Sequence, residues 1–196
     1  MREPLLTPDG PTPLTHLRGT AVVNSLRVMR ELGLGDRYWP AVGVANEEEL
    51  RSVVAQSWVP VELALIHYRA IDELVPDPEE QWAIGVRSAE RLQAIYLRTL
   101  ANLMRATGAL TVERVLERMR SPFDRMMKGG TIAAVRTGVK DAEVLLSDMP
   151  VLDIPYFRNG LGGWIVSGLK LGAPSVRGRV LRASGRGAAT YAVSWV

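Results

Sequence analysis

The chain has 196 residues, 47% of them hydrophobic and 23% charged, which is ordinary for one globular domain. It holds no cysteine, so disulfides, thiolate metal sites and cysteine catalysis are excluded, and its two histidines are too few for most zinc sites. The net charge of +3 conceals an asymmetry, because residues 154–196 hold six basic and no acidic side chains. No run of about 18 apolar residues and no signal-peptide pattern occurs, which predicts a cytoplasmic protein without a membrane span.

The start of the chain is rich in proline, with prolines at positions 4, 8, 11 and 13. Because proline fixes φ and lacks a backbone donor, we expect residues 1–15 to form a flexible, extended arm. We expect residues 16–196 to form a single α+β domain.

Apolar residues recur at spacings of three and four over most of the first two-thirds of the chain, which is typical of helices that bury one face. This spacing predicts helices over residues 21–32, 61–75 and 79–107. The first is expected to end at Gly33, and the third at Gly108.

Two further helices are indicated by capping patterns. Asn46 precedes three glutamates and is expected to cap a helix with Leu50, Val53 and Val54 facing inward. Thr111 is expected to cap the helix that follows it.

The pattern changes after Gly130. Residues 131–136 and 141–147 read as a hairpin, and residues 176–182 and 190–196 read as a second one. Between them, the apolar and glycine-rich segment 154–171 reads as a buried helix in which glycines permit close packing. The predicted fold class is therefore α+β: a helical N-terminal two-thirds, then a strand–strand–helix–strand–strand unit forming a small antiparallel sheet.

The C-terminal run PYFRNGLGGWIVSGLKLGA (155–173), followed by YAVSW (191–195), resembles the closing segment of a known superfamily. That superfamily contains the 4-vinyl-reductase-like domains, the haem–nitric-oxide-binding domains and trafficking-complex subunits of the same fold. Within it, the chain most resembles an uncharacterised paralogous family of myxobacteria. Shorter supporting segments are HLRGTA (16–21), SWVPVE (57–62) and GALTVERVL (108–116).

The resemblance implies an α+β domain that encloses a small apolar ligand, is often dimeric, and acts as a sensor rather than an enzyme. The functional residues of the better-known relatives do not carry over. Haem-binding relatives use a histidine on a central helix and a Tyr-x-Ser-x-Arg signature, but residues 79–128 contain no histidine and Tyr156-Phe-Arg158 lacks the spacing. Metal-binding relatives use cysteines. We therefore expect neither a metal nor another cofactor.

Four residues are candidates for lining a ligand pocket: His67, Trp82, Tyr96 and Trp164. His67 lies one turn from Leu63 at the edge of an apolar helix face, a pattern typical of an axial haem ligand and equally of a core histidine bonded to a carbonyl. We favour the core histidine. The aromatic residues are likewise consistent with plain core packing, and His16, beside the arm, is expected to be solvated.

Four arginines form a candidate basic patch on the second hairpin: Arg177, Arg179, Arg182 and Arg186. With nearby aromatic residues, such a patch can bind a nucleic-acid backbone and stack bases. The alternative is that Tyr191 and Trp195 face the core while the arginines form a solvated face. We favour this alternative, with the acidic remainder of the chain suggesting pairing within the molecule or across a dimer.

The sequence leaves three functions open. The favoured one is a non-catalytic small-molecule-sensing or adaptor domain that acts through a homodimer or a protein partner. The others are an interaction or scaffold module without a ligand, and nucleic-acid binding by the basic hairpin. No set of acid, base and nucleophile is apparent, so we do not expect an enzyme.

Overall fold

The computed structural model describes residues 2–96, 110–181 and 185–196. Its larger sheet is antiparallel, with the strand order β1-β5-β6-β8-β7. The strands are β1 Glu3–Leu6, β5 Thr131–Gly138, β6 Asp141–Ser147, β7 Val176–Val180 and β8 Ala189–Trp195. The two predicted hairpins are confirmed as β5–β6 and β7–β8, and β6 joins them by pairing with β8.

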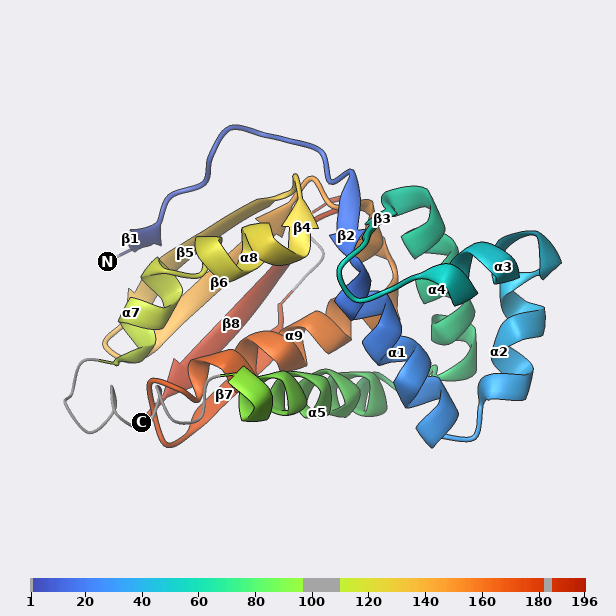
Figure 1. The fold of residues 1–196 in the computed structure, drawn as a ribbon. Helices are drawn as coiled ribbons and strands as arrows, with labels where there is room; N and C mark the ends of the chain where they lie inside the picture. Colours follow the sequence, from blue (N-terminus) through green and yellow to red (C-terminus); the bar gives the residue numbers. More distant parts are fainter. Residues whose placement is uncertain (1, 97–109, 182–184) are drawn as a thin grey trace.

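Helices cover the sheet in layers (Figure 1). Helix α9, Pro155–Leu169, packs on β7 and β8, and α5, Pro78–Tyr96, packs on α9. The short helices α7, Val112–Glu117, and α8, Arg120–Met126, lie toward the β1–β5 edge. The predicted α+β plan is confirmed. The predicted helix over 79–107 is confirmed as far as Tyr96, and its remainder lies outside the described residues.

The other helices gather at one end of the molecule (Figure 1). They are α1 Gly19–Glu31, α2 Gly35–Val42, α3 Val44–Ser52 and α4 Val61–Leu74, and a short 3-10 turn, η1 Pro150–Asp153, precedes α9. Helices α1 and α4 confirm their predictions, and α7 has Thr111 as its cap, with the side chain accepting from the Arg114 N–H at 3.3 Å.

The region from 35 to 54 differs from the prediction. Helix α2 was not expected there, because Pro40 and the flanking glycines hide the Tyr38/Val42 spacing. Asn46 does not cap α3; its Nδ2 instead donates to the Val42 carbonyl at 3.2 Å, since the helix already begins at Val44. Leu50 is buried as predicted, but Val54 is 57% exposed because it follows the end of α3.

A second, three-stranded sheet was also not predicted. It has the order β3-β2-β4, with β2 His16–Arg18, β3 Trp58–Pro60 and β4 Met127–Lys128. Strands of two or three residues show no alternation that a sequence pattern can reveal. His16 is half-buried in β2, and its Nδ1 lies 3.1 Å from the Thr15 hydroxyl, so the expectation of a solvated side chain is only partly met.

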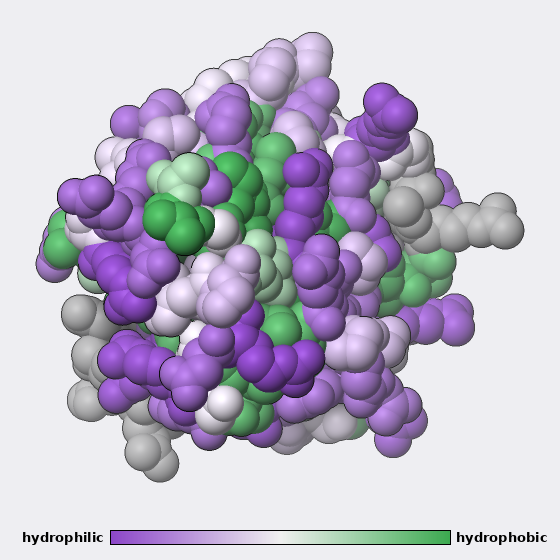
Figure 2. All heavy atoms as spheres, turned by 90° about the vertical axis from the view of Figure 1, so that its right-hand side faces the viewer, coloured by the Kyte–Doolittle hydropathy of each residue, from purple (hydrophilic) through white to green (hydrophobic). Residues whose placement is uncertain are grey.

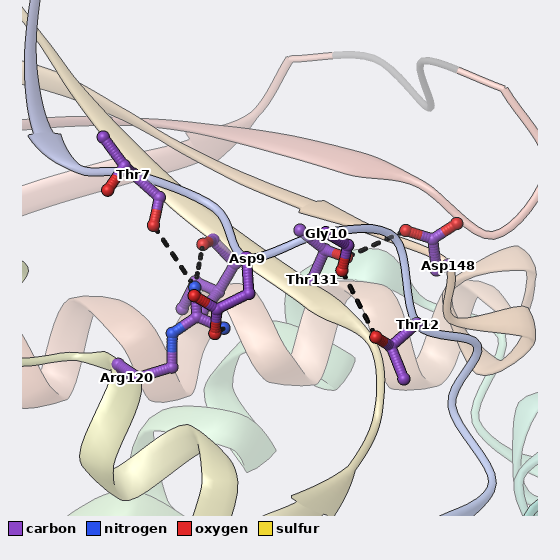
Figure 3. A network of polar contacts seen from close by, with 8 residues as sticks. Thr7, Asp9, Gly10, Thr12, Arg120, Thr131 and Asp148 are labelled. Carbon is purple, nitrogen blue, oxygen red and sulfur yellow. Dashed lines mark hydrogen bonds and ion pairs between the residues drawn. The ribbon is translucent and has the colours of Figure 1, made fainter.

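The N-terminal segment is extended, as its prolines require, but it is attached to the domain. β1 pairs with β5, the Gly130 N–H donates to the Thr12 carbonyl, and the Leu14 N–H donates to the Asp148 carbonyl. Between these points Arg120 of α8 holds Asp9 at 2.9 Å and also donates to the carbonyls of Thr7 and Ile132 (Figure 3). These contacts come from segments distant in the sequence, and the flexibility of residues 1–15 stays a prediction.

Candidate functional site

A cavity of about 160 Å³ lies where the N-terminal helices meet α8, α9 and the sheet. Its walls come from β2, α1, α4, α5, the α7–α8 region, β4, β5, β6 and α9. The lining residues are Leu17, Ala21, Asn24, Ser25, Tyr68, Gly85, Ser88, Met119, Pro122, Phe123, Met126, Met127, Ile132, Leu146, Tyr156, Phe157, Gly160, Leu161, Trp164 and Ile165. The site thus joins parts of the chain far apart in sequence.

Glycines bring the two long helices together beside this cavity. A Cβ at Gly85 of α5 would overlap the Gly160 carbonyl of α9, and one at Gly163 would overlap the Trp82 carbonyl. Side chains at these positions would therefore force α5 and α9 apart. The predicted role of the α9 glycines in close packing is confirmed.

The chemistry of the wall is almost wholly apolar. Methionine and phenylalanine side chains of the α7–α8 region form one part, while the residues of the wall with polar side-chain groups are Asn24, Ser25, Tyr68, Ser88 and Tyr156. None of the described residues in the wall carries a charged side chain. Such a cavity favours a neutral, apolar guest, because an ion would lose its hydration without gaining a partner.

The tyrosine hydroxyls of the wall stay protonated. Burial raises the pKa of Tyr68, and the neighbouring Ser25 side chain partly offsets this effect. Burial likewise raises the pKa of Tyr156, and the neighbouring Tyr68 raises it further. At neutral pH both side chains are therefore hydrogen-bond donors and not bases.

His67 lies behind this wall, and is fully buried in α4. Its Nε2 lies 2.6 Å from the Ser25 hydroxyl, and its Nδ1 lies 2.5 Å from the Tyr38 hydroxyl. The Ser25 hydroxyl donates to the carbonyls of Ala21 and Val22, so it accepts from Nε2–H, and Nδ1 accepts from Tyr38. Burial lowers the pKa of His67 to about 3, so the ring is neutral.

Of the described side chains among the four predicted pocket residues, only that of Trp164 belongs to the cavity wall. Trp164 lines the cavity. His67 does not line the cavity, because it lies behind the wall and bonds Ser25 and Tyr38. It is buried in the core, as the favoured interpretation expected, but its hydrogen-bond partners are hydroxyls and not a carbonyl. Trp82 packs against Gly162 of α9 outside the wall. The side chain of Tyr96 lies outside the described residues.

The basic hairpin has its aromatic residues inside. Tyr191 and Trp195 are buried, while Arg177 and Arg179 alternate with them on the exposed face of the β7–β8 pair. Arg186 is exposed in the turn, and Arg182 lies outside the described residues. The aromatic side chains are therefore not available to stack on bases, as the favoured alternative predicted.

The sequence did not indicate that three polar residues meet in the wall of one apolar cavity. These residues are Ser25, Tyr68 and Tyr156. Each lies on a different helix, so no local spacing connects them. The only available signal was the occurrence of a serine and tyrosines at apolar positions of helix stripes.

A second hollow, of about 270 Å³, lies between α1, α2 and α3 and is lined in part by Leu26, Tyr38 and Trp39. Figure 2 views the molecule from this end and shows hydrophobic side chains in patches between hydrophilic ones. Arg51 at this hollow is already paired with Glu47 at 2.7 Å and stacked over Trp39 at 3.8 Å. Its charge is therefore satisfied within the protein, and the apolar cavity is the better candidate site.

The residues around the cavity do not fit a haem. Both ring nitrogens of His67 are engaged by hydroxyls, so neither is available to iron. The cavity is close in size to one of about 150 Å³ that admits benzene, and a porphyrin is several times larger than benzene. No arginine or lysine in the described wall is placed to hold propionates.

The part of the chain that the structure describes contains neither a metal-binding cluster nor a membrane-spanning helix. No group of three or more histidine, aspartate or glutamate side chains in residues 2–96, 110–181 and 185–196 is arranged to hold a metal ion. In the same part of the chain, no helix combines the length and the apolarity needed to cross a membrane.

Comparison with known proteins places the fold. No protein-family model and no curated protein sequence matches the chain. Among solved structures, an Fe(II) unliganded mutant of the H-NOX protein from K. algicida is similar with a TM-score of 0.62 and 6% identity, over 92% of this chain and 97% of that one. A mutant of T. Tengcongensis H-NOX is similar with a TM-score of 0.55 and 12% identity, over 91% of this chain and 97% of that one. A Cs H-NOX mutant carrying 4-cyano-L-phenylalanine is similar with a TM-score of 0.55 and 13% identity, over 91% of this chain and 96% of that one. The chain therefore has the fold of H-NOX domains.

Proposed function

We propose that this protein is a haem-free, non-catalytic small-molecule-sensing or adaptor domain that binds a small apolar molecule in the cavity between α1, α5, α8 and α9. The observation that carries the proposal is an apolar wall, free of charged side chains among its described residues, around about 160 Å³. The solved H-NOX structures supply the fold, and the resemblance to vinyl-reductase-like domains supplies a precedent for apolar ligands in it.

The position of the cavity suits sensing. Its wall draws on α1 and α4 from the first half of the chain and on α8, α9 and the sheet from the second. A ligand that binds one arrangement of these elements more tightly than another increases the population of the arrangement that it prefers. This change in conformation would be the signal. A homodimer or a protein partner in the cytoplasm would read it.

Toluene is a suitable probe, since it is apolar and close to benzene in size. It should raise the melting temperature of the full chain in a saturable way, because a ligand that binds only the folded state stabilises it. Ala21→Leu adds three carbons to the wall and should abolish the shift. Ala83→Leu, an exposed position of the same size on α5, should keep it. A shift absent from the parent chain, or unchanged in Ala21→Leu, would overturn the proposal.

The association part of the proposal is tested separately. Light scattering over a wide concentration range, with and without toluene, should show the mass rising from monomer toward dimer. A constant monomer mass in both series would remove the homodimer and leave a different protein as the partner.

A further inference from the structure

The small sheet of β2, β3 and β4 (Figure 1) has one face toward the cavity and one toward solvent. Successive side chains of a strand point to opposite faces of its sheet. In β2, Leu17 is buried and lines the cavity, while the next residue, Arg18, is half-buried. In β4, Met127 is buried and lines the cavity, while the next residue, Lys128, is exposed. Two of the three strands therefore place one residue in the cavity wall and the next on the outer face.

The outer face holds two cations against one aromatic ring. The Arg18 guanidinium lies over the Trp58 ring, 4.9 Å from its centroid, and the Lys128 ammonium lies over the same ring at 4.6 Å. Trp58 belongs to β3 and Lys128 to β4, on opposite sides of β2. The ring attracts both cations but has no net charge, so it positions them without neutralising them. We call Arg18, Trp58 and Lys128 the cationic face.

The charges of the cationic face are not balanced within the described part of the chain, where no acidic side chain forms an ion pair with Arg18 or Lys128. Arg177 and Arg179 of β7 also lack such a pair, so this absence is not what distinguishes the cationic face. The distinguishing feature is that one ring holds two cations from different strands. Much of the freedom of these two long side chains is therefore already lost in the folded protein, which favours binding of an anion.

The chemistry of the cationic face fits an acidic segment of a partner protein. In an extended segment, carboxylates two residues apart lie on the same side at a spacing of about 7 Å, so two of them can meet two neighbouring cations at once. A single-stranded nucleic acid fits less well, because its recognition relies on aromatic faces on which bases stack. The Trp58 ring already has Arg18 and Lys128 over it.

We infer that the cationic face binds an acidic segment of a protein partner, and that a ligand in the cavity changes this binding through β2 and β4. The inference rests on the proposed function, since it names the surface at which a partner detects the cavity ligand. A ligand that displaces Leu17 or Met127 moves a strand whose next residue belongs to the cationic face. Because β2 pairs with both β3 and β4, a movement of one strand reaches the other two.

A rhodamine-labelled peptide in which glutamate alternates with threonine is a suitable probe, and the same peptide with glutamine in place of glutamate is its control. Fluorescence anisotropy with the full chain at low salt should show binding of the acidic peptide only, and added salt should weaken it. Arg18→Gln combined with Lys128→Gln should weaken this binding by about tenfold, because two surface ion pairs are lost. Arg18→Lys combined with Lys128→Arg keeps both charges and should bind like the parent chain.

The β7 strand offers a matched control for charge. Arg177→Gln combined with Arg179→Gln also removes two positive charges from exposed strand positions, and it should change the affinity for the acidic peptide by less than about twofold. The melting temperatures of both double variants should stay close to that of the parent chain, because all four side chains are at least partly exposed.

Toluene tests the connection between the cavity and the cationic face. Saturating toluene should change the affinity of the parent chain for the acidic peptide by about fivefold or more, as two coupled sites require. In Ala21→Leu, whose cavity is reduced, toluene should have no effect on the peptide.

The possible outcomes separate the surface from the cavity. If the acidic peptide does not bind the parent chain, or if the β7 variant weakens binding as much as the Arg18 and Lys128 variant, the cationic face is not the site. If toluene raises the melting temperature but leaves the peptide affinity unchanged, the connection fails and the cavity function stands. If toluene does not raise the melting temperature, the cavity function itself fails.

Two other results would overturn the assignment to a partner protein. An oligothymidine of the same charge that binds more tightly than the peptide through Arg18 and Lys128 would make the occupant a nucleic acid. A dimer of the parent chain that dissociates in the Arg18 and Lys128 variant, measured by light scattering, would make the occupant a second copy of this chain.

Discussion

The buried His67 makes the stability of the fold depend on pH. In the folded state its pKa is lowered from 6.5 to about 3, because the ring is fully buried. The unfolded chain therefore binds a proton that the folded chain rejects whenever the pH lies between these values. The stabilisation is fully present above pH 6.5 and is lost as the pH falls toward 3.

The magnitude follows from the shift. Each pH unit inside this window costs about 1.4 kcal/mol of the free energy of unfolding, so about 2 kcal/mol is lost between pH 7.5 and pH 5. The range above pH 5 is the informative one, because carboxylates with ordinary pKa values titrate below it. Over 196 residues a loss of this size is a large fraction of a typical stability of 5–15 kcal/mol.

Urea unfolding followed by circular dichroism between pH 7.5 and 5 measures the slope. His67→Phe should be less stable at pH 7.5, because Ser25 and Tyr38 lose their partner, but its stability should not fall by the same amount toward pH 5. His16→Gln, which removes the other histidine, should keep the slope of the parent chain. NMR of the parent chain gives a second measurement, in which the His67 ring protons should not shift between pH 7.5 and 5. A His67 resonance that titrates near pH 6.5, or equal stability at both pH values, would refute the reasoning.

Two further predictions concern packing and the N-terminal arm. Gly163→Ala should lower the free energy of unfolding by about 1–3 kcal/mol, because its Cβ would overlap the Trp82 carbonyl, whereas Gly168→Ala on the same helix meets nothing within 4 Å and should be neutral or stabilising by up to about 1 kcal/mol. Thermal or urea unfolding of the two variants compares them directly, and equal effects would contradict the close-packing argument. Arg120→Ala should speed amide exchange in residues 3–14 while changing the global stability by less than about 1 kcal/mol, because Asp9, its partner in the ion pair, is largely exposed to solvent. Arg125→Ala, an exposed position on the same helix, is the control, and unchanged exchange in Arg120→Ala would show that other contacts hold the arm.

This chain shares its fold with H-NOX structures to which it has little sequence identity. The arrangement of helices on an antiparallel sheet is kept, although identity to those structures is as low as 6%. Between these elements, methionine, phenylalanine and tyrosine side chains contribute to the wall of a cavity of about 160 Å³. A fold is held by the burial pattern of many positions, whereas a binding site depends on the identity of a few, so the two change independently.

Most of the longer helices and strands of this protein can be recognised from local patterns in its sequence. The three- and four-residue spacing in α1 and α4, the Thr111 cap and the two hairpins each depend on residues a few positions apart, so they can be recognised locally. The order of these elements then led to the α+β plan. The glycines of α9 indicated close packing, but not the helix against which they pack.

The candidate site, by contrast, depends on contacts between residues far apart in the sequence. Ser25 and Tyr38 lie 42 and 29 positions from the histidine that they bond, and Tyr156 lies on a helix from the other end of the chain. No periodicity records which side chains of separate helices meet, because this depends on how every helix packs at once. The same reason applies to the N-terminal arm: its prolines make it extended, but only its contacts with β5, α8 and Asp148 hold it against the domain.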